Sequence, residues 1–185
     1  MAESVADRTR IAADLERARR DFHRLLAAAG NEDCNKPTAG TRWTNEQLLF
    51  HMLFGYMLVR RLLFLVRIFD RLPDRVSRMF ARVLDSATPP FHVINYYTSC
   101  AAALVYNRHR MGNEMNRVIG KLQRSLAGEC ANDFLRGMHY PPGWDPYFSE
   151  YMTLADVYRY PGQHYDHHRK QLTLGAGSYP GPQLS

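Results

Sequence analysis

Residues 43–53 read WTNEQLLFHML, and they combine the start of a helix with a histidine on its apolar side. Thr44 is a preferred N-cap residue, and Gln47 three positions later completes a capping box. A helical pattern then continues for about seven turns until Pro73 interrupts it. The pattern therefore predicts a long helix over residues 45–70.

The inward side of this helix follows from the spacing of its apolar residues by three and four positions. The residues in that register are Leu48, His51, Gly55, Leu58, Leu62, Leu65 and Phe69. One of them is a histidine, and the glycine one turn later leaves free space beside it. An imidazole on a buried face is costly unless partners satisfy its two nitrogens, so His51 is a candidate metal ligand.

A second helix of this kind is predicted near the C-terminus, starting at the capping pair Thr153 and Asp156 and ending near residue 174. Its inward register contains Leu154, Val157, Pro161, His164, His168 and Leu172. His164 and His168 are one helical turn apart on the same face. Together with His51 they predict a divalent-metal site with three imidazole ligands and an open position.

The other histidines are weaker candidates for this site. His167 is an alternative to His168 because it is also one turn from His164, but its register places it on the flank of the helix. The remaining histidines are expected to form surface or local hydrogen bonds: His23, His92, His109 and His139. Imidazole ligands suit several metals, so we expect Zn, with Ni or Fe as alternatives.

Turn residues divide the rest of the chain into three further helices, over residues 4–29, 74–85 and 98–127. The second of these has its apolar residues on one side: Val76, Met79, Phe80, Val83 and Leu84. The third turns another set inward: Leu104, Met111, Met115, Val118, Leu122 and Leu126. No strand pattern of useful length is present, so the expected fold class is all-α. We expect a four-helix bundle with short helices in the connection between its second and third helices.

Length and composition indicate one globular domain. The chain has 185 residues, a formal net charge of +6 and 45% hydrophobic residues. We expect a single domain over residues 1–174 and a flexible tail over residues 175–185. The three cysteines, at positions 34, 100 and 130, form no close pair, which favours buried thiols and a cytoplasmic location. No nucleic-acid-binding motif accompanies the positive charge, so we expect no nucleic-acid partner.

Apolar segments of the chain suggest a protein partner. The helix over residues 45–70 is apolar on more sides than one bundle contact needs, which favours a homodimer or cover by residues 74–97. A peripheral membrane contact of the Arg-flanked segment 57–83 is a less favoured alternative. The aromatic loop over residues 139–151 is interpreted either as a lid or wall of a pocket for an apolar substrate, or as a packed connection.

Two motifs resemble the DinB superfamily of metal-binding four-helix bundles: WTxxQLLxHML at residues 43–53 and HxxxHxxQL at residues 164–172. The resemblance implies that His51, His164 and His168 bind a divalent metal. It also implies an enzyme similar to the mycothiol- and bacillithiol-dependent transferases and isomerases of that family. The hydrophobic, Arg-rich stretch over residues 56–97 is longer than this connection usually is in the family.

We therefore expect a metal-dependent S-transferase or isomerase that uses a low-molecular-weight thiol on a small, partly apolar electrophile. The alternatives are a metal-dependent hydrolase and a non-enzymatic metal- or ligand-binding bundle that associates with membrane surfaces. Near the histidine pair, Asp156, Asp166 and Tyr160 are candidates to orient a ligand or act as general base, or else for surface and capping roles. Gln171 is a candidate to position a ligand or substrate.

Overall fold

A computed structural model describes residues 2–174 of the chain, and the tail predicted over residues 175–185 lies outside the described residues. The helices in chain order are α1 (Ala2–Ala28), α2 (Asn31–Asn35), α3 (Asn45–Phe69), α4 (Asp74–Ser86), α5 (Thr88–Val105), α6 (Arg108–Ala127) and α7 (Leu154–Arg169). Between α6 and α7 lie two 3-10 helices and two short strands: η1 (Ala131–Leu135), β1 (Gly137–His139), η2 (Pro142–Trp144) and β2 (Tyr151–Thr153).

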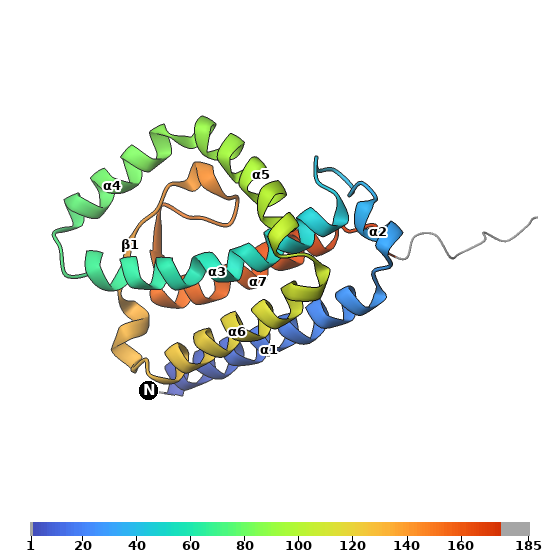
Figure 1. Cartoon of the computed structure of the whole chain (residues 1–185). Coiled ribbons are helices and arrows are strands. Elements are labelled where there is room, and N and C mark those ends of the chain that lie inside the picture. Colours follow the sequence, from blue (N-terminus) through green and yellow to red (C-terminus); the bar gives the residue numbers. More distant parts are fainter. Residues whose placement is uncertain (1, 175–185) are drawn as a thin grey trace, which may run out of the picture.

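Four long helices, α1, α3, α6 and α7, form a bundle, which confirms the expected all-α fold (Figure 1). Helix α3 packs along α7, and α1 packs along α6. The interior is filled by large apolar and aromatic side chains, of which Phe22, Tyr56 and Tyr165 are among the largest that are fully buried. Helices α4 and α5 connect α3 to α6 and arch over one side of the bundle.

The two helices that carry the candidate ligands begin as the sequence predicts. The Thr44 hydroxyl accepts a hydrogen bond from the backbone N–H of Gln47, whose side chain accepts one from the Thr44 backbone. The same reciprocal pair joins Thr153 and Asp156 at the start of α7. Both starts are local in sequence, which explains why they were predictable. Helix α7 ends at Arg169, earlier than expected.

The prediction of one helix over residues 98–127 is wrong, because α5 and α6 are separate helices. Helix α5 begins at Thr88 and contains Pro89 and Pro90 in its first turn, where a missing backbone N–H is tolerated. Helix α5 ends at Val105, and α6 starts at Arg108. The backbone N–H of Arg108 donates a hydrogen bond to the Glu46 side chain at 3.0 Å. This contact from α3 stabilises the new helix start and cannot be read from the local sequence.

The predicted inward sides of these connecting helices also need correction. In α4, Met79 and Val83 are 64% and 62% exposed, whereas Ser77 and Ala81 are buried. Leu104, predicted to face inward, is 84% exposed. Both helices have apolar residues on more than one side, so the sequence periodicity did not indicate which side would be covered.

A small hairpin was not predicted. Strand β1 pairs antiparallel with β2, with Met138 opposite Met152. Gly137 is required there, because a Cβ atom at this position would lie 2.6 Å from the Tyr151 side chain. Three-residue strands are too short to show an alternating pattern. The hairpin brings the ends of the loop over residues 140–150 together beside the start of α7.

Helix α3 is long and apolar enough to cross a membrane by length and composition alone. Most of its apolar stretch is buried among the other helices of the bundle. A core helix passes the same test, so this property is weak evidence for a membrane span.

Candidate metal centre

Three histidines from two helices meet in the interior. His51 comes from α3, while His164 and His168 come from α7. The ring centroid of His51 is 4.9 Å from that of His164 and 4.9 Å from that of His168, and the two α7 rings are 4.5 Å apart. One nitrogen from each ring lies within 4.8 Å of the others. This is the arrangement expected of three ligands around one ion.

The tautomer of His164 follows from its partner. Its Nδ1 atom lies 2.8 Å from a carboxylate oxygen of Asp145. An ionised carboxylate can only accept a hydrogen bond, so Nδ1 carries the proton and donates it. The lone pair is then on Nε2, which is buried and has no hydrogen-bond partner in the described structure. A metal ion is the partner that such an orphaned imidazole nitrogen fits.

The other two rings are held in the same way. The Nδ1 atom of His51 is 3.3 Å from the hydroxyl of Ser99 on α5, and that of His168 is 2.7 Å from the side-chain oxygen of Gln171. In all three histidines the polar contact is made at Nδ1, which leaves Nε2 free for a shared ligand. Gln171 thus has one of the two roles considered for it, that of positioning a ligand.

Gly55 provides the space that His164 occupies. A Cβ atom on Gly55 would lie 3.0 Å from Cδ2 and 3.5 Å from Nε2 of the His164 ring. Any larger residue would press on the edge of the imidazole that carries the free nitrogen. The gap in the side chains of α3 and the orphaned nitrogen on α7 both fit a bound divalent cation.

Burial and neighbouring imidazoles keep the rings of His51 and His168 uncharged. Burial, with the neighbouring imidazoles, lowers the pKa of His51 well below its usual value. The same causes lower the pKa of His168 to about 4. Burial alone would raise the pKa of the Asp145 carboxyl, but its hydrogen bonds with His164, Tyr147 and Tyr160 lower that pKa. Neutral imidazoles next to an ionised carboxylate are ready to bind a cation without first losing protons.

A cavity of about 210 Å³ opens beside the three histidines. Its apolar walls come from four segments of the chain: Trp43, Phe54, Leu58, Phe91, Trp144, Pro146 and Phe148. Its polar lining, apart from the triad, consists of His92, Asn95, Asp145 and Tyr160. Asp145 is the one carboxylate among these lining residues, and Tyr160, Tyr147 and His164 already donate to it.

The aromatic loop over residues 139–151 forms one wall of this cavity. This agrees with the interpretation of the loop as a pocket wall. Trp144 stacks on Phe91 of α5, with ring centroids 3.9 Å apart and an interplanar angle of 8°. Its indole N–H donates to the backbone oxygen of Leu84 at 2.9 Å. Trp43, which also lines the cavity, stacks on His51 with ring centroids 4.4 Å apart. The loop is therefore held against the α4–α5 connection.

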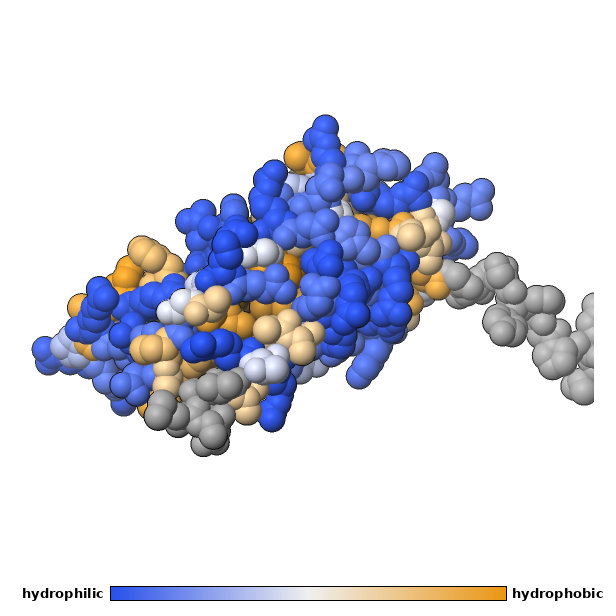
Figure 2. Space-filling model, turned by 90° about the horizontal axis from the view of Figure 1, so that it is seen from below, coloured by the Kyte–Doolittle hydropathy of each residue, from blue (hydrophilic) through white to orange (hydrophobic). Residues whose placement is uncertain are grey.

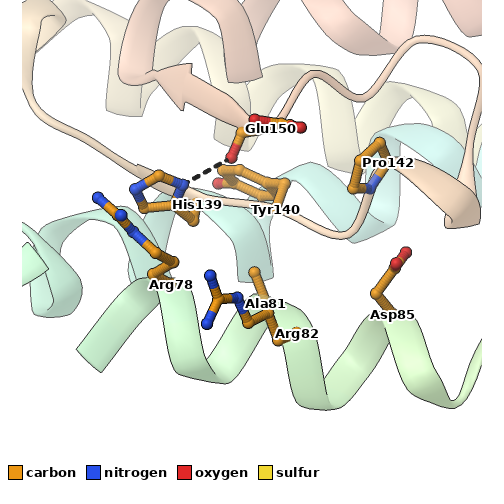
Figure 3. Close-up of a pocket in the computed structure, with 8 residues that line it drawn as sticks. All are labelled: Arg78, Ala81, Arg82, Asp85, His139, Tyr140, Pro142 and Glu150. Carbon is orange, nitrogen blue, oxygen red and sulfur yellow. Dashed lines mark hydrogen bonds between the residues drawn. The ribbon is translucent and has the colours of Figure 1, made fainter. Parts of the chain in front are cut away.

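A second hollow, of about 420 Å³, lies between α4 and the loop that follows β1 (Figure 3). His139 contacts the backbone oxygen of Glu150 with one ring nitrogen and the Asp74 carboxylate with the other. The Asp85 carboxylate accepts a hydrogen bond from the backbone N–H of Gly143. These contacts tie the loop that forms one wall of the metal centre to α4.

The remaining residues proposed from the sequence make contacts outside the three-histidine cluster. Asp156 bonds Thr153 at the start of α7, and Asp166 pairs with Arg17 of α1. His167 lies against Tyr147 outside the triad. Of the three cysteines, all free thiols, Cys34 is buried, Cys100 is partly buried and Cys130 is exposed, so burial was expected correctly for the first only.

Several residues of the site were missed from the sequence. Asp145 is in a proline-rich loop, and Ser99 and Asn95 are on the helix whose start was misplaced. His92 is exposed, as expected, and also lines the cavity, which was not expected. The one signal for Asp145 in the sequence was its position nineteen residues before His164. Because Asp145 lies in an irregular loop, no helical or strand periodicity predicted where its side chain would point.

Comparison with known proteins identifies a family. The sequence model of the DinB superfamily matches residues 14–172, which include α3, α7 and all three histidines. Neither the curated proteins nor the solved structures contain a match to the chain.

Proposed function

Since this chain belongs to the DinB superfamily, we propose that it is a metal-dependent enzyme that transfers a low-molecular-weight thiol to a small, partly apolar electrophile. The metal ligands in this proposal are His51, His164 and His168. Zn is the first candidate for the ion, with Ni or Fe as alternatives, because neutral imidazoles suit all three. A bound divalent cation would act as a Lewis acid that lowers the pKa of a coordinated thiol.

The observation that carries the thiol-transfer proposal is the predominantly apolar wall of the cavity beside the triad. Seven apolar side chains line it, and apart from the triad its polar lining is limited to His92, Asn95, Asp145 and Tyr160. Asp145 accepts hydrogen bonds from three donors, among them His164, and therefore orients a ligand. A thiol and a partly apolar electrophile fit such walls better than water does.

Other residues of the cavity would orient a ligand histidine and bind the substrate. Asp145 holds the proton on Nδ1 of His164, which keeps the lone pair on Nε2. The aromatic walls favour the apolar body of an electrophile and exclude water from it. Asn95, on the polar lining, offers an amide that both donates and accepts hydrogen bonds to a carbonyl or hydroxyl of the substrate.

Elemental analysis of the purified protein tests the metal assignment. We expect about one equivalent of a transition metal in the wild type and little in a His164→Ala/His168→Ala variant. The matched control is His167→Ala on the same helix, which should keep the metal because its ring lies outside the triad. Equal, low metal contents in the wild type and the double variant would show that the site is wrongly assigned.

Turnover tests the reaction. Metal-loaded and chelator-stripped protein would be mixed with mycothiol or bacillithiol and 1-chloro-2,4-dinitrobenzene, an aromatic electrophile, and thioether formation measured. We expect turnover by the loaded protein only. Hydrolysis of a p-nitrophenyl ester without thiol transfer would indicate the hydrolase alternative. Metal binding without either reaction would indicate a non-enzymatic bundle.

A further inference from the structure

Helix α5 differs from a normal surface helix, because polar residues on its inner side reach the metal centre while large apolar residues on its outer side are exposed. Its inner side presents Asn95 and Ser99 to the metal centre. Its outer side exposes five large apolar residues, with exposed fractions between 56% and 84%: Val93, Ile94, Tyr97, Leu104 and Val105. The polar inner side is explained by the site that it covers. The apolar outer side has no such partner within the described chain.

The outer side of α5 is also free of charge. The sequence from Ser86 to Asn107 contains no Lys, Arg, Asp or Glu. A helix that lies on a membrane surface carries Lys or Arg beside its apolar face, and this helix has none. By contrast, polar and charged residues cover most of the face formed by α1 and α6 (Figure 2). An uncharged apolar surface loses least in desolvation when it meets another surface of the same kind.

The exposed residues follow the spacing of a coiled-coil seam. Ile94, Tyr97, Ala101 and Leu104 are separated by three, four and three positions, and all four are exposed. This spacing places their side chains in one line along the helix. Val93 and Val105 flank the two ends of the line and are 56% and 57% exposed.

The seam is also symmetrical about residue 99. Ile94 and Leu104 are each five positions from it, and Tyr97 and Ala101 are each two positions from it. If a second α5 packs antiparallel on the first, Ile94 therefore lies level with Leu104 of the other copy. The large Tyr97 ring lies level with the small Ala101. A twofold axis requires this self-complementary pairing of one surface with itself.

We propose that the outer face of α5 binds the same face of a second copy of this chain, in an antiparallel pair with a twofold axis at the level of residue 99. The paired length, from Val93 to Val105, is about 18 Å. Such a contact is smaller than the roughly 800 Å² per partner typical of stable complexes. We therefore expect a dimer that dissociates at concentrations of about micromolar.

The proposal is independent of the metal and of the reaction. Each copy retains its own three histidines, because these come from α3 and α7 of one chain. The dimer would cover the outer side of the helix whose inner side holds Ser99 against His51. A shift in oligomeric state thus tests the interface even if the proposed chemistry fails.

Sedimentation of the full chain at several concentrations is the first test. We expect a species of twice 21.4 kDa at high concentration that falls to half that mass on dilution. The single variants Ile94→Glu and Leu104→Lys should each remain monomeric, because an unpaired charge would be buried in the seam. The control Leu135→Glu changes an equally exposed apolar residue on η1 and should still dimerise.

The double variant Ile94→Glu/Leu104→Lys tests the antiparallel pairing. In the proposed dimer each glutamate faces a lysine of the other copy, so the double variant should dimerise again, and more weakly at high salt. In a parallel pair, like charges would meet and the variant would stay monomeric, which would overturn the proposed geometry. Circular dichroism of each variant checks that it is folded.

A monomeric wild type at high concentration would overturn the proposal altogether, as would dimeric single variants. Incubation of that monomer with vesicles of phosphatidylglycerol and phosphatidylcholine would then identify the other occupant. Co-sedimentation that Ile94→Glu abolishes would assign the outer face of α5 to a membrane surface.

Discussion

The Nδ1 atom of His164 lies 2.8 Å from a carboxylate oxygen of Asp145, nineteen residues earlier in the chain. The same carboxylate accepts hydrogen bonds from the Tyr160 hydroxyl and from the backbone N–H of Tyr147. Three donors thus hold one ionised oxygen pair behind one candidate ligand. This relationship selects the tautomer of His164 and aims its lone pair at the other two imidazoles.

The variant Asp145→Asn is expected to weaken metal binding about 10–100-fold. The amide has nearly the same shape, but it lacks the charge that keeps the proton on Nδ1 of His164. Chelator competition measures the dissociation constant. Asp166→Asn is the matched control, since Asp166 lies between His164 and His168 in the sequence but pairs with Arg17. Equal affinities of both variants and the wild type would contradict this role of Asp145.

The variant Gly55→Ala is expected to lower metal affinity without unfolding the protein. Its new Cβ atom would lie 3.0 Å from the His164 ring, so the ring must move away from its partners. Alanine otherwise favours a helix by about 1 kcal/mol over glycine. Gly120→Ala in α6, whose nearest contact would be the flexible Arg124 at 3.6 Å, is the control for that gain.

The two glycine variants should therefore differ in thermal unfolding as well as in metal affinity. We expect Gly120→Ala to raise the melting temperature and leave the metal affinity unchanged. Gly55→Ala should bind metal several-fold more weakly and gain less stability. If both variants bind metal as the wild type does, the space at Gly55 has no role in the site.

The variant Trp144→Ala is expected to loosen the loop over residues 140–150. It removes the stack on Phe91 and the hydrogen bond to the Leu84 backbone oxygen. Hydrogen exchange should become faster in this loop and in the first turns of α5, while α1 and α6 keep their protection. Trp43→Ala, which removes the stack on His51 instead, should leave exchange in the loop unchanged. Equal changes in exchange along the whole chain in both variants would contradict this local coupling.

The metal-free protein is expected to lose stability as the pH falls from 6.5 to about 4. In this window an unfolded His168 with the usual pKa of 6.5 binds a proton, whereas the folded side chain, with a pKa of about 4, does not. The unfolded state therefore gains protons first, and the free energy of unfolding decreases with falling pH. The lowered pKa of His51 acts in the same direction.

Thermal melting in the presence of a chelator measures this effect between pH 7 and pH 4.5. The variant His168→Gln should show a smaller decrease in melting temperature than the wild type, because one of the buried imidazoles is gone. Parallel curves for the two proteins would contradict the shift at His168. With metal bound, the decrease should be steeper, since protons then compete with the cation for the same nitrogens.

The sequence alone determined the parts of this protein that depend on local interactions. The capping pairs Thr44 with Gln47 and Thr153 with Asp156 involve residues three positions apart, and both were predicted. The helical register that brings His164 and His168 to one face has a period of one turn, and it was predicted as well. These short-range patterns were enough to predict the bundle and the meeting of the three histidines.

The tertiary structure alone decided which residues surround those histidines. Asp145 and Ser99 reach the rings from a loop and from α5, and no periodic pattern connects them to His164 or His51. The break between α5 and α6 is stabilised by Glu46 from a distant helix. Helix α5 has apolar residues on its exposed side and polar residues facing the metal centre, so Leu104, predicted to face inward, is exposed instead. The physical reason is the same in each case: long-range contacts, rather than local propensity, determine where these residues lie.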